Sequence, residues 1–189
     1  MSAARGSKRA WGAIALAALA LGCGSVAKPY AEPVMLAAPR APLALPVRLD
    51  LASLRRGELP GENHGYEERR LVGEALAANA ARVARAAFRD VADARGRPVL
   101  RPRVVFLEIG SGGAGFSRDL CSLVLEWALV ADGDRTVWIE TVGATDHDVR
   151  TAVEQTLRAS LDALVRAPEL RRYAEHGLPQ PPEPVAELD

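Results

Sequence analysis

Few side chains in this sequence could perform chemistry, and their spacing argues against an enzyme. The candidates among its 189 residues are Cys23, Cys121, His64, His147 and His176. No histidine has a second His or Cys at the spacing of a metal site, so zinc is not expected. His147 lies between Asp146 and Asp148, but no nucleophile is placed to use it as a base. The sequence therefore predicts no catalytic residue and no metal.

Three other segments resemble catalytic or ligand motifs without fulfilling them. The glycine-rich run 110–115 follows a predicted strand, but a dinucleotide site needs a helix directly afterwards. From Ser117 onwards the chain continues as a strand instead, so the run predicts a connection between strands. Residues 115–119 depart from the G-x-S-x-G elbow of hydrolases because they end in Asp119. Residues 132–134 predict a turn, and the further ligands of a calcium loop are missing from the sequence around them. No cofactor is expected.

The N-terminal residues 1–22 have the three zones of a secretory signal. Arg5, Lys8 and Arg9 precede an apolar run from Ala10 to Leu21, and the small residue Gly22 follows. This run is shorter than the roughly 20 residues of a transmembrane helix. The alternative is a buried N-terminal helix, but the Gly- and Pro-rich sequence that follows offers it no core. We expect export.

The segment just before Cys23 resembles the lipobox of bacterial lipoproteins. In that family the thiol receives diacylglycerol and the signal is cut directly before it, so the resemblance implies lipidation at Cys23. Two positions depart from the family pattern: Ala20 stands where Leu is usual, and Leu21 where a small residue is usual. Gly24, where an Asp would retain the protein in the inner membrane, implies the outer membrane.

Cysteine usage and charge narrow the function further. If lipid occupies Cys23, then Cys121 has no disulfide partner, and its apolar surroundings predict a small buried hydrophobe. The whole chain has 24 basic and 24 acidic residues. Removing the three basic residues of the signal leaves 21 against 24, or −3, which argues against nucleic-acid binding.

Composition divides the exported chain into three parts. Residues 23–46 carry five prolines, which predicts an extended tether from the lipidated Cys without a helix. Residues 47–167 are long enough for a single domain. Residues 168–189 predict a short helix or turn followed by a Pro-rich disordered tail.

The predicted fold is α/β, a two-layer α+β sandwich ordered β-α-β-β-β-α. Its largely antiparallel sheet carries two helices packed on one face. A strand at 47–51 and a loop at 52–66 precede a helix whose apolar residues run from Leu76 to Val91 and which ends at Gly96. Strands follow at 102–109, 118–130 and 135–142. Thr145 or Asp146 caps a last helix that ends near Pro168.

The hairpin between the last two strands can be predicted by parity. Apolar residues occupy odd positions in both strands. A two-residue turn would pair odd positions of one strand with even positions of the other, and would set Glu140 opposite Leu125. A three-residue loop at 131–133 with Gly133 left-handed pairs Leu125 with Ile139 and keeps the carboxylate out of the core. We expect this bulged loop, because burying an unpaired carboxylate costs several kcal/mol.

The same parity leaves an even-numbered face for solvent or for a partner. Two helices most simply cover only the odd face. The even face combines aromatic side chains with glutamates, and its candidate contact residues are Phe106, Glu108, Trp138 and Glu140. The alternative is an ordinary solvated face with scattered apolar residues.

This arrangement resembles small Gram-negative envelope lipoproteins: the YajG-like lipoproteins, the auxiliary lipoproteins of ABC-type transporters and the lipopolysaccharide-assembly lipoprotein. The local similarity lies in 137–143 and 152–157. The resemblance implies a lipid-anchored, periplasm-facing outer-membrane protein that serves a protein complex of the envelope as a non-enzymatic adaptor. The alternative is a carrier of a lipid or another small apolar ligand.

Overall fold

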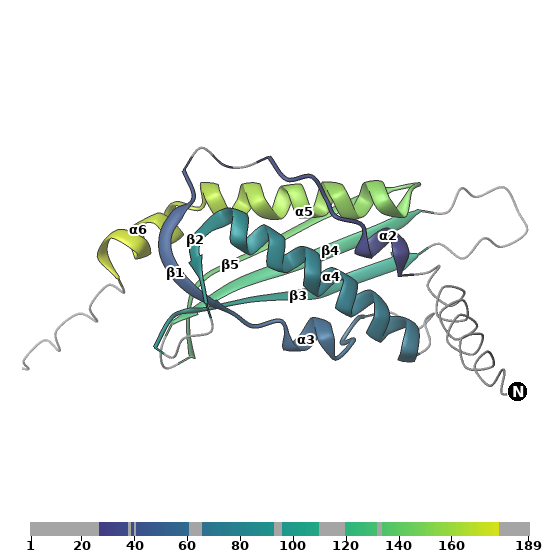
Figure 1. The fold of residues 1–189 in the computed structure, drawn as a ribbon, viewed down its shortest axis with the longest axis horizontal. Coiled ribbons are helices and arrows are strands. Elements are labelled where there is room, and N and C mark those ends of the chain that lie inside the picture. The colour runs from purple at the N-terminus through teal and green to yellow at the C-terminus, as the bar shows by residue number, and fades with distance from the viewer. Residues whose placement is uncertain are drawn as a thin grey trace, which may run out of the picture.

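A three-stranded antiparallel meander forms the larger part of the sheet in the computed structural model (Figure 1). The structure describes residues 27–37, 39, 41–60, 66–92, 96–109, 120–131 and 134–177. Its elements, in chain order, are α2 (Lys28–Ala31), β1 (Leu43–Leu49), α3 (Ala52–Arg55), α4 (Tyr66–Ala87), β2 (Phe88–Val91), β3 (Val99–Ile109), β4 (Cys121–Ala131), β5 (Arg135–Asp146), α5 (Val149–Arg166) and α6 (Pro168–His176).

The sheet is mixed, with the strand order β2-β1-β3-β4-β5. β1 pairs in parallel with β2 from Leu43 to Val47, and its last two residues pair in parallel with the start of β3. The pairs β3–β4 and β4–β5 are antiparallel. The α/β fold class is therefore confirmed, with parallel pairing at one side of the sheet.

Strand β2 is an addition to the predicted order. The sequence predicts one helix through Val91, but α4 ends at Ala87 and the chain continues as a strand from Phe88. Val91 stands four residues after Ala87, which also fits the helical period, so periodicity alone could not separate the two elements. Phe88 is 1% exposed, and its burial beside β1 stabilises the strand.

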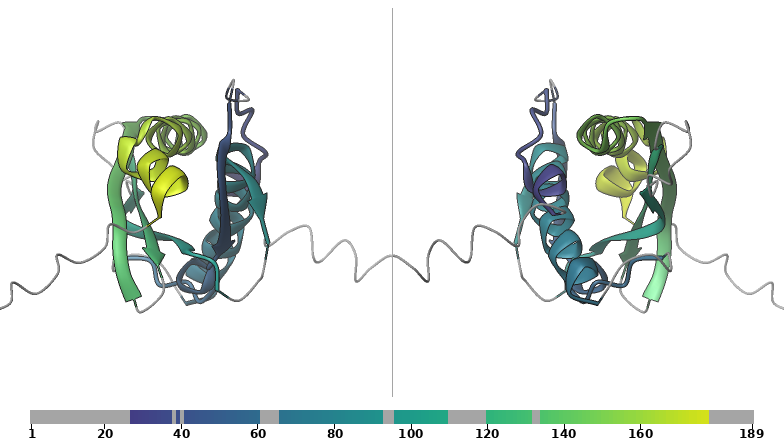
Figure 2. Two further views of the ribbon diagram at one scale, coloured as in Figure 1. Left: turned by 90° about the vertical axis from the view of Figure 1, so that its left-hand side faces the viewer. Right: turned by 90° about the vertical axis from the view of Figure 1, so that its right-hand side faces the viewer.

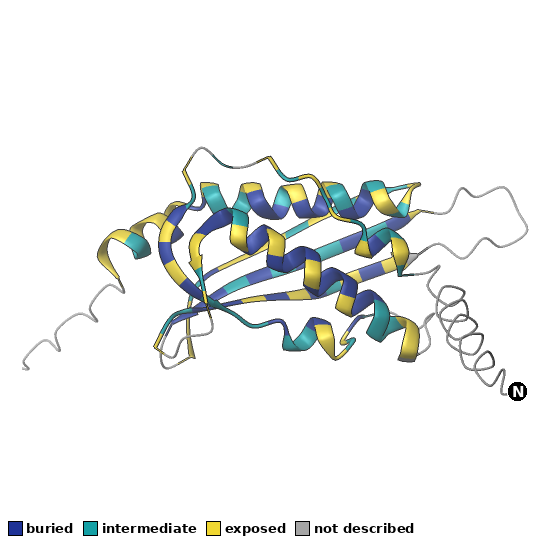
Figure 3. Cartoon of the chain, in the orientation of Figure 1, coloured by how far each residue is buried: buried dark blue, intermediate teal, exposed yellow. Residues whose placement is uncertain are grey.

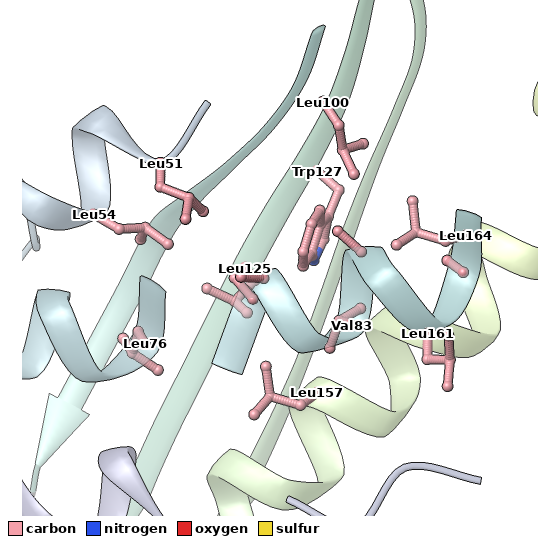
Figure 4. Close-up of a cluster of buried hydrophobic side chains, with 14 of the residues drawn as sticks. Leu51, Leu54, Leu76, Val83, Leu100, Leu125, Trp127, Leu157, Leu161 and Leu164 are labelled. Carbon is pink, nitrogen blue, oxygen red and sulfur yellow. The ribbon is translucent and has the colours of Figure 1, made fainter. Parts of the chain in front are cut away.

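Helices α4 and α5 pack on the same side of the meander (Figure 2). Buried and less buried residues alternate along β4, as Figure 3 shows, because successive side chains of a strand point to opposite faces. The core face of β4 carries Leu123, Leu125, Trp127 and Leu129, all at most 1% exposed. In Figure 4, Val83 of α4 and Leu157 of α5 lie close to Trp127 and Leu125.

A polar connection also joins α5 to β4 inside the core. The indole N–H of Trp127 donates to Ser160 Oγ at 3.0 Å, and Ser160 Oγ donates to the Thr156 carbonyl at 2.8 Å. Thr156 Oγ1 lies 3.1 Å from the carbonyl oxygen of Leu123. Because both hydroxyls are fully buried yet have partners, the connection satisfies its polar atoms and sets the position of α5 on the sheet.

The prediction of an extended tether over residues 23–46 is wrong for its described part. Residues 28–31 form a helix, Tyr30 is 0% exposed, and residues from Leu43 onwards belong to β1. Pro29 does not prevent this helix, because the first helical turn needs no N–H from that residue. The packed domain therefore begins some twenty residues earlier than predicted.

The C-terminal part agrees with the expected short helix. Helix α6 spans Pro168–His176, and its Leu170 is 0% exposed. The tail that was predicted to be disordered lies outside the described residues, which end at Gly177. The predicted loop 52–66 contains a helical turn, α3, whose Leu54 is also fully buried.

The predicted register of the β4–β5 hairpin is wrong. Ala131 pairs with Arg135, so the connection has three residues as expected, but it starts one residue later than predicted. A bulge then leaves Val137 without a partner, and Leu125 faces Val142 instead of Ile139. Asp134 has φ 58°, while Gly133 lies outside the described residues. Odd positions of β4 thus pair with even positions of β5.

Glu140 does not suffer the expected desolvation, because β5 is the last strand of the described sheet. Glu140 lies opposite Trp127, on the core-facing side, yet it remains exposed. A carboxylate at the sheet edge reaches water, so the expected desolvation cost does not arise.

Candidate functional site

The side of the meander turned away from α4 and α5 is the candidate interaction surface, and we call it the outer sheet face (Figure 2). The pairing of the three strands sets its members in rows. These are Arg101, Ala128 and Ile139; Arg103, Glu126 and Thr141; Phe106, Val124 and Gly143; and Glu108, Ser122 and Thr145.

A bulge in β3 turns Phe106 outwards. Before the bulge, even residues such as Leu100 and Val104 face the core, and Val104 pairs with Leu125. Val105 then has no partner, and Leu107 takes the next core position at 5% exposure. Phe106 consequently pairs with Val124 on the outer sheet face and is 46% exposed. The extra residue exposes a large aromatic side chain.

Two of the four predicted contact residues lie on this face and two do not. Phe106 and Glu108 are there, both exposed, as the parity argument predicted. Trp138 is 7% exposed and belongs to the core, opposite Leu129. Trp138 and Glu140 are therefore corrected: the bulge at Val137 turns them to the core-facing side.

Sequence reasoning missed Ile139, which takes the outward position expected for Trp138. It is 54% exposed and lies beside Ala128. The segment Val137-Trp138-Ile139 is apolar throughout, so no pattern in it distinguishes the buried residue from the exposed one.

A salt bridge separates the two exposed apolar side chains. The Arg103 guanidinium donates to both carboxylate oxygens of Glu126, at 2.6 and 3.0 Å. The hydrogen bond from Arg103 to Glu126 raises the pKa of Arg103 above its ordinary value. The two hydrogen bonds fix the orientation of the two charged groups relative to each other. Phe106 and Ile139 thus lie on either side of a fixed polar pair.

One margin of the outer sheet face opens into a shallow groove of about 460 Å³ beside α3. Arg56, Arg101 and Arg103 line it. Each arginine has a carboxylate partner: Glu58 lies 2.6 Å from Arg56, and Asp50 lies 3.4 Å from Arg101. Because the cations are already paired, the groove offers no concentrated positive charge for an anionic ligand.

The predicted burial of Cys121 is confirmed. It is 2% exposed, and burial raises the pKa of its thiol, so the reactive thiolate is disfavoured. Within the described ranges, no group of three or more His, Cys, Asp or Glu residues could hold a metal ion. The other motifs considered lie outside those ranges: Cys23, His64, the run 110–115, Ser117 and the Asp132-Gly133 pair.

No helix in the described part of the chain combines the length and apolar character needed to cross a bilayer. Comparison of the chain with models of protein families, with characterised proteins and with solved structures finds no match.

Proposed function

We propose that this chain is a lipoprotein anchored to the outer membrane through Cys23, whose periplasm-facing domain is a non-enzymatic adaptor or accessory subunit of an envelope assembly or transport complex. Two features support the proposal. The first is the N-terminal sequence, with a charged, an apolar and a small-residue zone directly before a cysteine. The second is the outer sheet face.

The observation that carries the adaptor role is the exposure of Phe106 and Ile139 on a sheet face that α4, α5 and α6 leave open. Protein interfaces are enriched in aromatic residues at their centres and surround them with polar groups. Here the two apolar side chains flank the Arg103–Glu126 pair, and threonines and serine occupy neighbouring positions of the same face. This composition suits a protein partner of mixed polarity.

The described core favours an adaptor over the alternative of a lipid carrier. A carrier would need open apolar space between the sheet and the helices. That space is occupied by Trp127, Leu125 and Leu157, each at most 1% exposed. The groove beside α3 mixes charged side chains such as Arg101 and Glu126 with apolar ones such as Ala128 and Ile139, so it offers no continuous apolar lining.

Photocrosslinking in native membranes tests the adaptor role. A photoreactive amino acid at Ile139 should join the chain to a discrete envelope protein. The same group at Ala78, an exposed position on α4, should not. A second substitution, Arg103→Glu, sets two carboxylates side by side and should reduce the Ile139 adduct. Equal adducts at both positions, or none at Ile139, would contradict the proposal.

The anchor has its own test. Cys23→Ser should yield an uncleaved or soluble product, and the parent chain should carry the mass of attached acyl groups. Unchanged processing and membrane attachment of the variant would refute lipidation at Cys23.

A further inference from the structure

The described chain begins with a segment that is bound to two helices of the domain, α4 and α5. Residues 28–32, which we call the N-terminal clasp, bury Tyr30 completely. The Asn79 side chain of α4 donates to the carbonyl oxygens of Tyr30 and Glu32, at 2.6 and 3.2 Å. Arg150 of α5 pairs with Glu32 at 3.0 Å. The clasp is therefore part of the packed domain.

Only a short stretch of chain lies between the clasp and Cys23, the proposed site of the lipid anchor. Lys28, its first residue, follows Cys23 by five positions. Even fully extended, five residues reach at most about 18 Å. The tether expected from residues 23–46 would have reached several times further. Wherever Cys23 is held, the clasp must lie close by.

The clasp marks one end of an elongated domain (Figure 1). It contacts the first turn of α5 through Arg150, and Tyr30 lies next to Cys121, the first residue of β4. Leu120 precedes that residue and is 46% exposed. Helix α6 follows the other end of α5, whose 18 residues span about 27 Å. Leu120 and α6 thus lie at opposite ends.

We propose that the clasp end of the domain is held against the lipid headgroups of the bilayer, with Lys28 and Leu120 at the membrane surface and α6 directed away from it. This orientation rests on the proposed lipidation of Cys23. It follows from the length of chain between the acylated residue and Lys28. In this orientation the strands of the outer sheet face extend away from the membrane surface.

Among the described residues, the charges at this end do not supply the attraction. Lys28 is positive, but Asp146 pairs with Cys121 at the end of β5, and Asp148 caps the start of α5. Attraction to anionic lipids requires a cluster of cations. Contact imposed by the covalent anchor should therefore persist at high salt, where surface charges are screened.

The orientation also places the proposed partner surface at a definite height. β4 begins at the clasp end with Cys121, and Ala128, the neighbour of Ile139, follows seven residues later. At about 3.3 Å per residue, Ile139 lies about 23 Å further from the bilayer than the start of β4. A partner that docks on Ile139 would project into the periplasm beside the domain.

Quenching by labelled lipids tests the orientation on the acylated chain. A fluorescent amino acid replaces Leu120 in one sample and Glu175, exposed on α6, in the other. Each protein is reconstituted into phosphatidylcholine vesicles that contain a headgroup-nitroxide lipid. We expect severalfold stronger quenching at position 120 than at position 175, in low and in high salt.

A length variant separates this inference from the anchor itself. Twenty Gly and Ser residues inserted after Gly24 should leave acylation unchanged and lower the quenching at position 120 to the value at position 175. Equal quenching at both positions of the parent chain, or no effect of the insertion, would overturn the orientation while leaving lipidation intact. A parent chain without the acyl mass would overturn both proposals.

Discussion

Asn79→Ala is the most informative single substitution in this domain. Asn79 is 2% exposed and lies in α4, and its amide nitrogen serves two carbonyl oxygens of the N-terminal clasp. Truncation to Ala removes both hydrogen bonds and leaves the Tyr30 carbonyl buried without this donor. The substitution introduces no bulk, so its effect reports the attachment of the clasp.

The expected magnitude follows from three contributions. Each lost hydrogen bond costs about 1 kcal/mol, and a buried acceptor left unsatisfied costs about 1–3 kcal/mol. Ala is a better helix former than Asn by about 0.5 kcal/mol, which acts in the opposite direction. Because the bond to Glu32 is long at 3.2 Å, we expect a net loss of about 2 kcal/mol. This corresponds to a roughly 30-fold larger population with the clasp detached.

Two assays measure the effect in the mature chain carrying Cys23→Ser. Guanidinium unfolding followed by the fluorescence of Trp127 and Trp138 gives the free energy of unfolding. Chymotrypsin should cleave after Tyr30 about 30-fold faster in Asn79→Ala, because cleavage needs the detached state when opening is rapid. The matched control is Gln155→Ala, which removes an amide from an exposed position of α5.

The reasoning would be refuted by an Asn79→Ala chain as stable as its parent, since helix propensity alone predicts a slight gain. A loss of similar size in Gln155→Ala would also refute it, because that amide has no role in holding the clasp.

Three further predictions test the register and the titrating groups. Trp138→Ala should lower the free energy of unfolding by about 3–5 kcal/mol, and Ile139→Ala by less than about 0.5 kcal/mol; the reverse order in denaturant titrations would contradict the observed register. Asp148→Ala removes the cap that accepts from the Thr151 N–H at 2.9 Å and should cost about 1 kcal/mol at neutral pH. Hydrogen bonds from Thr151 lower the pKa of Asp148. The difference in unfolding free energy between the parent chain and Asp148→Ala should therefore vanish as the pH falls through that lowered pKa. A difference that stays constant with pH would exclude the cap. Burial raises the pKa of Cys121, so the folded chain retains a proton that the unfolded chain loses above about pH 8.5. The free energy of unfolding should therefore decline as the pH rises from there. Cys121→Ala should reduce the decline measured between about pH 8.5 and 9.5, and an unchanged slope would exclude the thiol as its cause.

Periodicity predicted the elements whose two faces differ in polarity. In α5 the apolar residues Val153, Leu157 and Leu164 recur at helical spacing and are all 0% exposed. In β4 the odd positions are apolar and the structure buries them. The outward placement of Phe106 could also be predicted, because Glu108 shares its parity in β3 and a carboxylate favours solvent.

Periodicity failed where neighbouring residues are all apolar. Val137, Trp138 and Ile139 suit either face of a strand, so the choice depends on the bulge and not on composition. The same limit hid β2, whose Phe88 and Val91 continue the apolar pattern of α4. In the N-terminal segment, proline content suggested an isolated chain, although Tyr30 is an aromatic residue that can be buried against helices.

By itself, the sequence determined the α/β class, the main helices and strands, and the chemistry available to the chain, because these depend on local polarity and residue type. Only the tertiary structure decided which of Trp138 and Ile139 is buried and how close the domain lies to Cys23. Both depend on contacts between separate elements: the bulged pairing of β4 with β5, and the hydrogen bonds of Asn79 to the clasp, which lies 47 to 49 residues before it. Local patterns carry no record of these contacts, because the same residues are compatible with either arrangement until the rest of the chain packs around them.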